Sequence, residues 1–139
     1  MEESVPTYRH QVRYHETDSQ GYVFNARYLE IVDVAMTEFI RSLGYAYEDF
    51  IAAGADPSVV TADINFKKPA RYDDLLDVFV DCLEVGRSSF RLRTTIMRRG
   101  ETIAVATLVY VNVDPEAETS RPLPETVADA LRRRLIKSS

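Results

Sequence analysis

The sequence contains little of what usually reveals a catalytic or metal centre: one cysteine, two histidines and no tryptophan in 139 residues. Cys82 cannot form an intramolecular disulfide, and within its apolar, strand-like segment we expect it to act as a small hydrophobic side chain. Only His10 and His15 are available as partners, and no His–Glu pair has the spacing of a metal-binding helix. We therefore expect neither a cysteine nucleophile nor a metal site.

Long apolar runs and an excess of positive charge are also missing. No stretch approaches the roughly 18 consecutive apolar residues of a membrane span. The acidic start, Met1 to Ser4, is followed by no apolar run of the kind found in a signal peptide. The formal net charge of −5 gives no general attraction for nucleic acid phosphates, and the run from Arg132 to Arg134 is too short to change that. We expect a cytoplasmic protein that binds neither membranes nor nucleic acid.

The patterns that are present predict one α+β domain over residues 1–139. Apolar residues recur at helical spacing from Asn25 to Leu43, with Asn25 as a candidate N-cap and Gly44 as a stop. Short links between consecutive strands predict an antiparallel sheet. The remaining expected elements are strands at 8–14, 59–66, 75–85, 88–98 and 102–113, a short helix at 47–53, and a last helix at about 125–136.

The loop between the first strand and the long helix concentrates the candidate chemistry. It carries two carboxylates, Glu16 and Asp18, just before a helix N-terminus whose first N–H groups lack intrahelical partners. Such N–H groups can stabilise charge on a carbonyl oxygen while a carboxylate attacks the carbonyl or activates a water. The residues alone leave open that both carboxylates only cap the helix or shape the turn.

Three stretches carry a resemblance to a known family. Residues 12–18 read VRYHETD, residues 21–30 read GYVFNARYLE, and residues 64–74 read INFKKPARYDD, with GRSSF following at 86–90. In this order they resemble the 4-hydroxybenzoyl-CoA thioesterase-like family of the hotdog superfamily, from about Tyr8 to Asp114. The resemblance implies a hotdog fold, a long central helix wrapped by a curved antiparallel β-sheet. It also implies that two subunits pair, as a homodimer or homotetramer, with active sites at their interface.

The same resemblance implies an acyl-CoA thioesterase that releases free acid and coenzyme A, with coenzyme A as part of the substrate and no other cofactor. Asp18 takes the position of the catalytic aspartate, as nucleophile or general base. Glu16 takes the upstream acidic position, where it organises the loop. Backbone N–H groups near Phe24 and Asn25 would form the oxyanion site, and the Asn25 side chain could polarise the carbonyl or position a water.

Candidate substrate-binding residues fall into three groups, and each has an ordinary structural alternative. Basic side chains suit the phosphates of coenzyme A, although each can also be a solvated surface charge: Lys67, Lys68, Arg71, Arg87 and Arg91. Two serines resemble the family segment beside the pantetheine arm, or form a polar turn: Ser88 and Ser89. Three aromatic side chains line an acyl pocket or pack in the core: Tyr28, Phe39 and Phe66.

Three other functions stay open at this point. A thioesterase acting on acyl-carrier-protein thioesters would present the same pantetheine arm to the site. A non-catalytic hotdog domain that binds an acyl ligand is disfavoured by the intact Asp18 with its Gly21 and Asn25 context. A dehydratase or hydratase of the same fold depends on a histidine in a different setting, and neither histidine here falls on the long helix.

Overall fold

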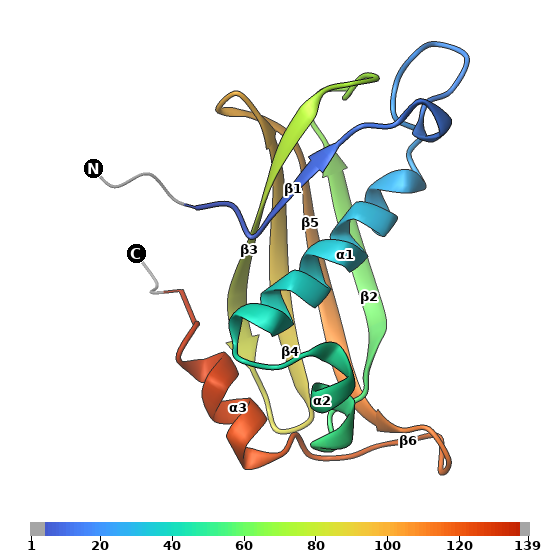
Figure 1. Cartoon of the computed structure of the whole chain (residues 1–139). Helices are drawn as coiled ribbons and strands as arrows, with labels where there is room; N and C mark the ends of the chain where they lie inside the picture. The colour runs from blue at the N-terminus through green and yellow to red at the C-terminus, as the bar shows by residue number, and fades with distance from the viewer. Residues whose placement is uncertain (1–4, 137–139) are drawn as a thin grey trace. The chain divides into compact units, whose positions relative to one another are not determined.

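The computed structural model describes residues 5–136. Three α-helices, a short 3-10 helix and six strands follow one another along the chain (Figure 1). In chain order they are β1 (Tyr8–Gln11), η1 (Tyr14–Glu16), α1 (Arg27–Ser42), α2 (Tyr47–Ala52), β2 (Pro57–Phe66), β3 (Leu75–Val85), β4 (Ser89–Arg98), β5 (Glu101–Asp114), β6 (Thr119–Ser120) and α3 (Glu125–Arg132).

The strands form one sheet with the order β1-β3-β4-β5-β2, and β6 pairs with β5 off this path. Pairing is antiparallel where β1 meets β3 and where β6 meets β5. Strand β4 shows why this sequence makes strands, because every second side chain is buried and the others are partly exposed. The buried set on this strand is Phe90, Leu92, Thr94 and Ile96.

By its internal contacts the chain divides into two units, which are described separately. The division cuts helix α1 and strands β2, β3, β4 and β5, so that each of them contributes one part to each unit. The first unit comprises residues up to Phe39, Ile64–Val80 and Thr94–Ala106, and the second comprises Ile40–Asp63, Asp81–Arg93 and the chain from Thr107 on.

In the first unit, helix α1 as far as Phe39 buries an apolar face. Five of its buried side chains recur at helical spacing, as the sequence predicted: Ile31, Val32, Ala35, Met36 and Phe39. Strand β1 pairs with β3 in a register that sets Tyr8 opposite Val78 and Gln11 opposite Leu75. This unit holds the loop between β1 and α1, where the candidate chemistry lies.

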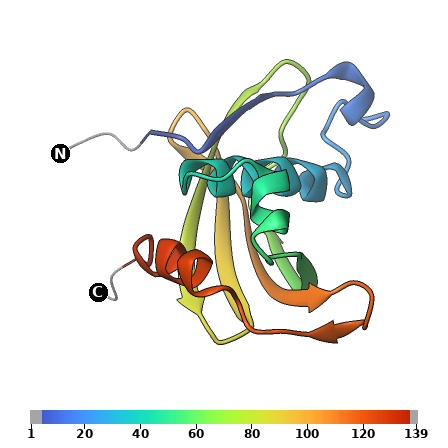
Figure 2. The ribbon, with the colours of Figure 1, turned by 60° about the horizontal axis from the view of Figure 1, so that its bottom comes forward.

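In the second unit, buried aromatic rings and one buried amide hold the elements together. Phe90 stacks on Tyr110 with ring centroids 5.1 Å apart. The buried side chain of Asn112 accepts a hydrogen bond from the Asp56 N–H and donates to the carbonyls of Gly54 and Pro122. Figure 2 shows helix α3 beside the ends of β3 and β4 that belong to this unit.

The predicted elements are found, but three of their limits were wrong. The first strand ends at Gln11, and the chain then turns into η1 instead of extending to Tyr14. The long helix begins at Arg27, so Asn25 precedes it by two residues and is not its N-cap. The last helix stops at Arg132, because the chain beyond it pairs with the edge of β3: the Ile136 N–H donates to the Cys82 carbonyl. Strand β6 was missed, since two residues carry no period.

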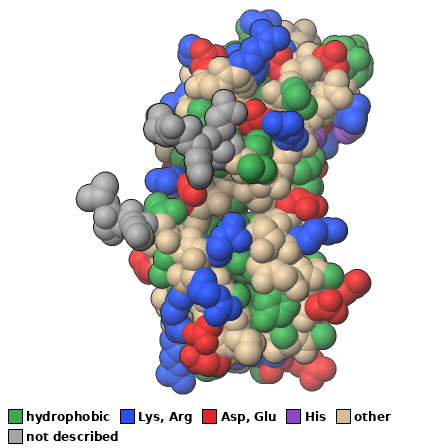
Figure 3. Space-filling model, turned by 60° about the vertical axis from the view of Figure 1, so that its left-hand side comes forward, with side chains coloured by type: hydrophobic (Ala, Val, Ile, Leu, Met, Phe, Trp, Pro, Cys, Tyr) green, Lys and Arg blue, Asp and Glu red, His purple; other side chains and the backbone are tan. Residues whose placement is uncertain are grey.

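Some predictions remain outside what the structure tests. The acidic start from Met1 to Ser4 lies outside the described residues, and one domain over residues 1–139 stays a prediction. Across the described part of the chain, no helix has the length and apolar character needed to cross a membrane. Acidic and basic side chains are interspersed on the face shown in Figure 3.

Candidate active site

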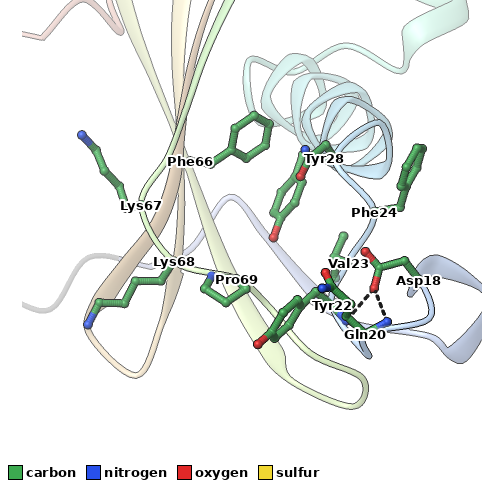
Figure 4. A pocket seen from close by; sticks show the side chains of 11 residues that line it. Asp18, Gln20, Tyr22, Val23, Phe24, Tyr28, Phe66, Lys67, Lys68 and Pro69 are labelled. Atoms are coloured by element: carbon green, nitrogen blue, oxygen red, sulfur yellow. Dashed lines mark hydrogen bonds between the residues drawn. The ribbon is translucent and has the colours of Figure 1, made fainter.

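A cavity of about 350 Å³ opens in the first unit at the start of helix α1 (Figure 4). The loop before the helix, the first turn of the helix and the chain just after β2 form its walls. Seven of the residues predicted from the sequence line it, namely Asp18, Phe24, Asn25, Tyr28, Phe66, Lys67 and Lys68, together with Gln20, Tyr22, Val23 and Pro69. Carboxylate, backbone amide and aromatic groups therefore share one cavity.

A tight turn fixes the carboxylate of Asp18. Its Oδ1 accepts hydrogen bonds from the N–H groups of Gln20 (2.9 Å) and Tyr22 (3.2 Å), which Figure 4 marks as dashed lines. The backbone closes the turn, because the Gly21 N–H donates to the Asp18 carbonyl and the Asp18 N–H donates to the Tyr22 carbonyl. Gly21 has a φ of 81°, which glycine adopts without the cost that a side chain would add. Within residues 5–136 the second oxygen, Oδ2, has no hydrogen-bond partner and is available for chemistry.

The start of helix α1 offers N–H groups that the fold does not use. The Phe24 N–H donates to the Glu16 carbonyl at 2.9 Å, so it is already occupied. In contrast, the N–H groups of Asn25 and Ala26 have no partner among the described residues. The next two N–H groups are already used: the Arg27 N–H donates to the Phe24 carbonyl, and the Tyr28 N–H donates to the Asn25 carbonyl. Of the two residues named for the oxyanion site, Asn25 is therefore the one with an available amide, at the positive end of a 16-residue helix.

Glu16 does not line the cavity. Its side chain is buried, with both oxygens close to Nε2 of His10 (2.9 and 3.0 Å) and Oε1 accepting the Arg13 N–H at 2.7 Å. Burial alone would raise the pKa of this carboxyl, but the hydrogen bonds from Arg13 and His10 outweigh it, and the pKa lies below its usual value. Glu16 is therefore an ionised residue beneath the loop, whereas Asp18 is exposed on it.

Aromatic side chains form the apolar side of the cavity. Tyr28 is buried, its hydroxyl accepts the Ala70 N–H at 3.2 Å, and burial raises its pKa. Its ring meets the Phe66 ring edge to face, with the two ring centroids 5.3 Å apart. Figure 4 shows the two side chains next to each other. Phe66 is 47% exposed. Phe39, the third aromatic candidate, is 1% exposed and belongs to the core, so it does not line this cavity.

The two lysines at the end of β2 differ in their surroundings. Lys68 forms an ion pair with Glu101 at 2.6 Å, and Glu101 is also paired with Arg98. The hydrogen bonds from Lys68 and Arg98 together lower the pKa of the Glu101 carboxyl. In the described part of the chain, Lys67 has no ion pair. Figure 4 shows both lysine side chains pointing away from Asp18. Lys67 is consequently the better placed of the two to meet a phosphate outside the cavity.

The other substrate-binding candidates are not cavity residues. Arg87, Ser88 and Ser89 belong to the second unit, where the Ser89 carbonyl accepts the Gly86 N–H and the Ser88 carbonyl accepts the Asn112 N–H. Arg91, in the same unit, pairs with Glu84 at 3.4 Å. Their predicted contacts with coenzyme A stay predictions.

Sequence reasoning missed three participants in this region. Tyr22 lines the cavity and carries the guanidinium of Arg71 4.7 Å above its ring. Gln20 completes the turn around Asp18. His10 was considered only as a metal ligand or a partner for cysteine, although it contacts Glu16. The alternation along β1 could have indicated that His10 and Tyr8 point to the same side.

The described residues 5–136 contain no cluster of side chains suited to binding a metal ion. No group of three or more His, Cys, Asp or Glu side chains within residues 5–136 is arranged to hold a metal ion. Cys82 is buried in the second unit, and burial raises the pKa of its thiol to about 11. A thiolate is therefore disfavoured at neutral pH.

Comparison with known proteins gives consistent similarities over most of the chain. The model of the thioesterase superfamily matches residues 20–105, a range that begins two residues after Asp18. Acyl-CoA thioesterase YbgC of Haemophilus influenzae is 31% identical over 105 residues, 75% of this chain and 77% of that protein. The 1,4-dihydroxy-2-naphthoyl-CoA hydrolase of Synechococcus elongatus is 25% identical over 123 residues, 87% of this chain and 90% of that protein.

A solved structure adds a likeness in three dimensions. A thioesterase from Thermus thermophilus, complexed with coenzyme A and zinc, is 27% identical to this chain. It has a TM-score of 0.77 and covers 91% of this chain and 90% of its own.

Proposed function

The chain belongs to the thioesterase superfamily, and we propose that it hydrolyses acyl-coenzyme A thioesters with Asp18 as the catalytic carboxylate. Thioester hydrolysis and the hotdog fold are supported for the chain as a whole by its relatives. The proposal adds the residues and their roles.

One observation carries the proposal: Asp18, with one carboxylate oxygen that has no partner in residues 5–136, and Asn25, with a backbone N–H that has none there either, line the same cavity. Asp18 Oδ2 supplies the first, and Asn25 at the beginning of α1 supplies the second. A thioester carbonyl bound between them would meet a nucleophile or base on one side and hydrogen-bond donors on the other. This combination stabilises the oxyanion that forms as the carbonyl is attacked.

Two mechanisms use this arrangement. In the first, Asp18 Oδ2 attacks the thioester carbon, the C–S bond breaks, and coenzyme A leaves as a thiolate that takes up a proton. The resulting mixed anhydride is then hydrolysed by water to regenerate Asp18. In the second, Asp18 takes a proton from a water that attacks the carbon directly, the C–S bond then breaks, and the proton passes from Asp18 to the leaving thiolate of coenzyme A. In both, Gln20 and Tyr22 hold the other carboxylate oxygen, so the group is oriented before the substrate arrives.

The surroundings support a substrate with an apolar acyl group and a phosphorylated arm. Tyr28, Phe66 and Val23 offer an apolar wall, and Lys67 offers a charge without an ion-pair partner in the described residues. Coenzyme A carries phosphates at the far end of its pantetheine arm, and relatives act on acyl-CoA esters. Arg87, Ser88 and Ser89 are proposed as further contacts for that arm.

A thioester on an acyl carrier protein is the alternative substrate, because it presents the same arm and thioester. A non-catalytic acyl-binding role is disfavoured because Asp18, held by the Gln20 and Tyr22 N–H groups, places a charged carboxylate in a cavity that an apolar acyl ligand would enter.

The test is thiol release from a panel of acyl-CoAs with short, long, branched and aromatic acyl groups. Asp18→Asn should lower kcat/KM by about 100-fold or more, the range attributed to a positioned base. Asp33→Asn, on an exposed position of α1, is the matched control and should retain full activity. Circular dichroism confirms that both variants are folded.

Either of two results would redirect the assignment. Turnover by Asp18→Asn above a tenth of wild type would move the catalytic role to another residue. If the wild type released no thiol from any acyl-CoA but did so from an acyl carrier protein, the carrier-protein substrate would replace coenzyme A esters.

A further inference from the structure

A partly buried histidine that the proposed mechanism does not use connects strand β1 to the site. His10 lies on β1 with its side chain 15% exposed, and its Nε2 faces both oxygens of Glu16, whose side chain is 7% exposed. On the opposite side of the ring, Nδ1 lies 2.9 Å from the Tyr8 hydroxyl. Three side chains thus form a continuous chain, Tyr8–His10–Glu16, inside the first unit.

The chemistry of the partners fixes which ring nitrogen carries the proton. An ionised carboxylate only accepts hydrogen bonds, so Nε2 must be the protonated nitrogen and donate to Glu16. In the neutral ring Nδ1 is then an acceptor, and the Tyr8 hydroxyl donates to it. Tyr8 therefore selects the tautomer that Glu16 requires, because the bond made by one ring nitrogen determines the state of the other.

Glu16 contacts the backbone on both sides of the site, before Asp18 and before Asn25. Its backbone carbonyl accepts the Phe24 N–H, and Phe24 immediately precedes the available amide of Asn25. Its carboxylate also accepts the Arg13 N–H at 2.7 Å, which closes the η1 turn two residues before Asp18. A shift of Glu16 would consequently move the carboxylate and the oxyanion donors relative to each other.

We propose that Tyr8, His10 and Glu16 form a positioning chain that holds Asp18 and the Asn25 amide in register for catalysis. This inference rests on the proposed function, since it assigns a role in the same reaction. None of the three side chains lines the cavity, so they act through the loop and do not touch the substrate.

Other charged groups adjoin the chain without replacing any of its members. The electrostatic influence of Glu38 on α1 reaches Tyr8, and burial together with Glu16 and Glu38 raises the pKa of the Tyr8 hydroxyl. Tyr8 therefore stays protonated and remains a donor at neutral pH. His15 also acts on Glu16 through its charge but makes no hydrogen bond within residues 5–136.

The kinetic test compares two substitutions of His10. His10→Leu removes both hydrogen bonds and should lower kcat by about tenfold or more with KM little changed, because small displacements of reacting groups are costly. His10→Gln carries an amide N–H that can donate to Glu16, and it should restore most of kcat. Arg9→Leu removes an exposed side chain of the same strand, one that pairs with Asp77 and not with Glu16, and is the matched control, with kcat expected at the wild-type value.

A second readout does not depend on activity. Long-range ¹H–¹⁵N spectra at neutral pH should show His10 with a proton on Nε2, and Tyr8→Phe should shift its Nδ1 signal. A His10 ring without a proton on Nε2 would overturn the proposed hydrogen bonds between Tyr8, His10 and Glu16. The expected tautomer combined with an unchanged kcat in His10→Leu would show that these hydrogen bonds serve only stability, and would also overturn the proposal.

The two proposals can fail separately. If wild type shows no thioester hydrolysis, the proposed function fails, while the spectra still report whether Tyr8, His10 and Glu16 are hydrogen-bonded to one another. If Asp18→Asn is inactive and His10→Leu turns over like wild type, the catalytic assignment stands and the positioning role is lost.

Discussion

At the residue scale, Asp18 and Glu16 show how two nearby carboxylates acquire different roles. Asp18 is exposed, with one oxygen held by backbone amides and the other available. Glu16 is buried and has both oxygens engaged by His10 and Arg13. The sequence could separate them only through the family resemblance, because side-chain burial depends on how the loop folds back on β1.

The lowered pKa of Glu16 predicts a specific acid sensitivity. Because its pKa in the folded protein lies below the usual 4.5, ionised Glu16 contributes stability above about that pH and loses it as the pH falls through the folded value. Glu16→Gln should therefore be less stable than wild type at neutral pH, by about 1–2 kcal/mol. The difference should shrink as the pH falls below about 4.5.

Thermal unfolding of both proteins between pH 7 and pH 3 measures this difference, with pH 7 and pH 3 taken as roughly the plateau and the acid limit. Glu116→Gln, an exposed carboxylate beside β6, is the control and should follow wild type at every pH. A stability gap between wild type and Glu16→Gln that stays constant with pH would contradict an ionised, hydrogen-bonded Glu16.

At the element scale, hydrophobic period predicted the long elements well and the short ones poorly. Strand β3 runs from Leu75 to Val85 as expected, because over most of its length its residues alternate between buried and partly exposed positions. The 3-10 turn η1 has three residues and strand β6 has two, too few to show any period. The last helix was predicted to extend too far because Leu135 and Ile136 continue its apolar spacing in the sequence, although both residues lie beside β3 instead.

The start of helix α1 is the element on which the oxyanion prediction depends. Asn25→Pro deletes an N–H that makes no hydrogen bond in residues 5–136 and retains the carbonyl that accepts the Tyr28 N–H. Proline is tolerated at helix starts, so the fold should survive while kcat falls by about 100-fold, the effect of losing one oxyanion donor.

Asn25→Ala is the matched control, because it keeps the N–H and removes the side chain. Steady-state kinetics on both variants therefore separate the backbone from the side chain. Equal losses in Asn25→Pro and Asn25→Ala would assign the role to the side-chain amide, and unchanged rates in both would exclude Asn25 from the oxyanion site.

At the scale of the whole molecule, the sheet order explains why the sequence could predict the architecture better than the site. Short strand connections and one long amphipathic helix determine the α+β class, and both are visible as local patterns. The site instead assembles residues 18–28 with residues 66–69, which no local pattern relates. Only the resemblance to the family linked them before the structure did.

The sheet order also leaves β2 as a terminal strand. Beyond β2 no further strand of the described residues follows, and its side chains Val59 and Val60 are 51% and 55% exposed. A long apolar strand at a sheet edge is a liability for a monomer, because its backbone can pair with another chain. The family resemblance implies that two subunits join to make a continuous sheet, and this edge offers the means.

We therefore predict that the protein is at least a dimer in solution, through antiparallel pairing of β2 with the same strand of a second copy. Light scattering after size exclusion should give at least twice the chain mass of 15.8 kDa. Val60→Glu places a charge on this edge and should shift the mass toward 15.8 kDa, whereas Val5→Glu, exposed near the N-terminus, should not. A wild-type mass of one chain would refute the pairing, and an unchanged oligomer in Val60→Glu would move the interface to another surface.

The family resemblance places the active sites at the interface between subunits. The cavity residues Phe24 and Phe66 are exposed, and we expect the second copy to cover them and enclose the acyl group. Activity should therefore be lost in parallel with dissociation in Val60→Glu.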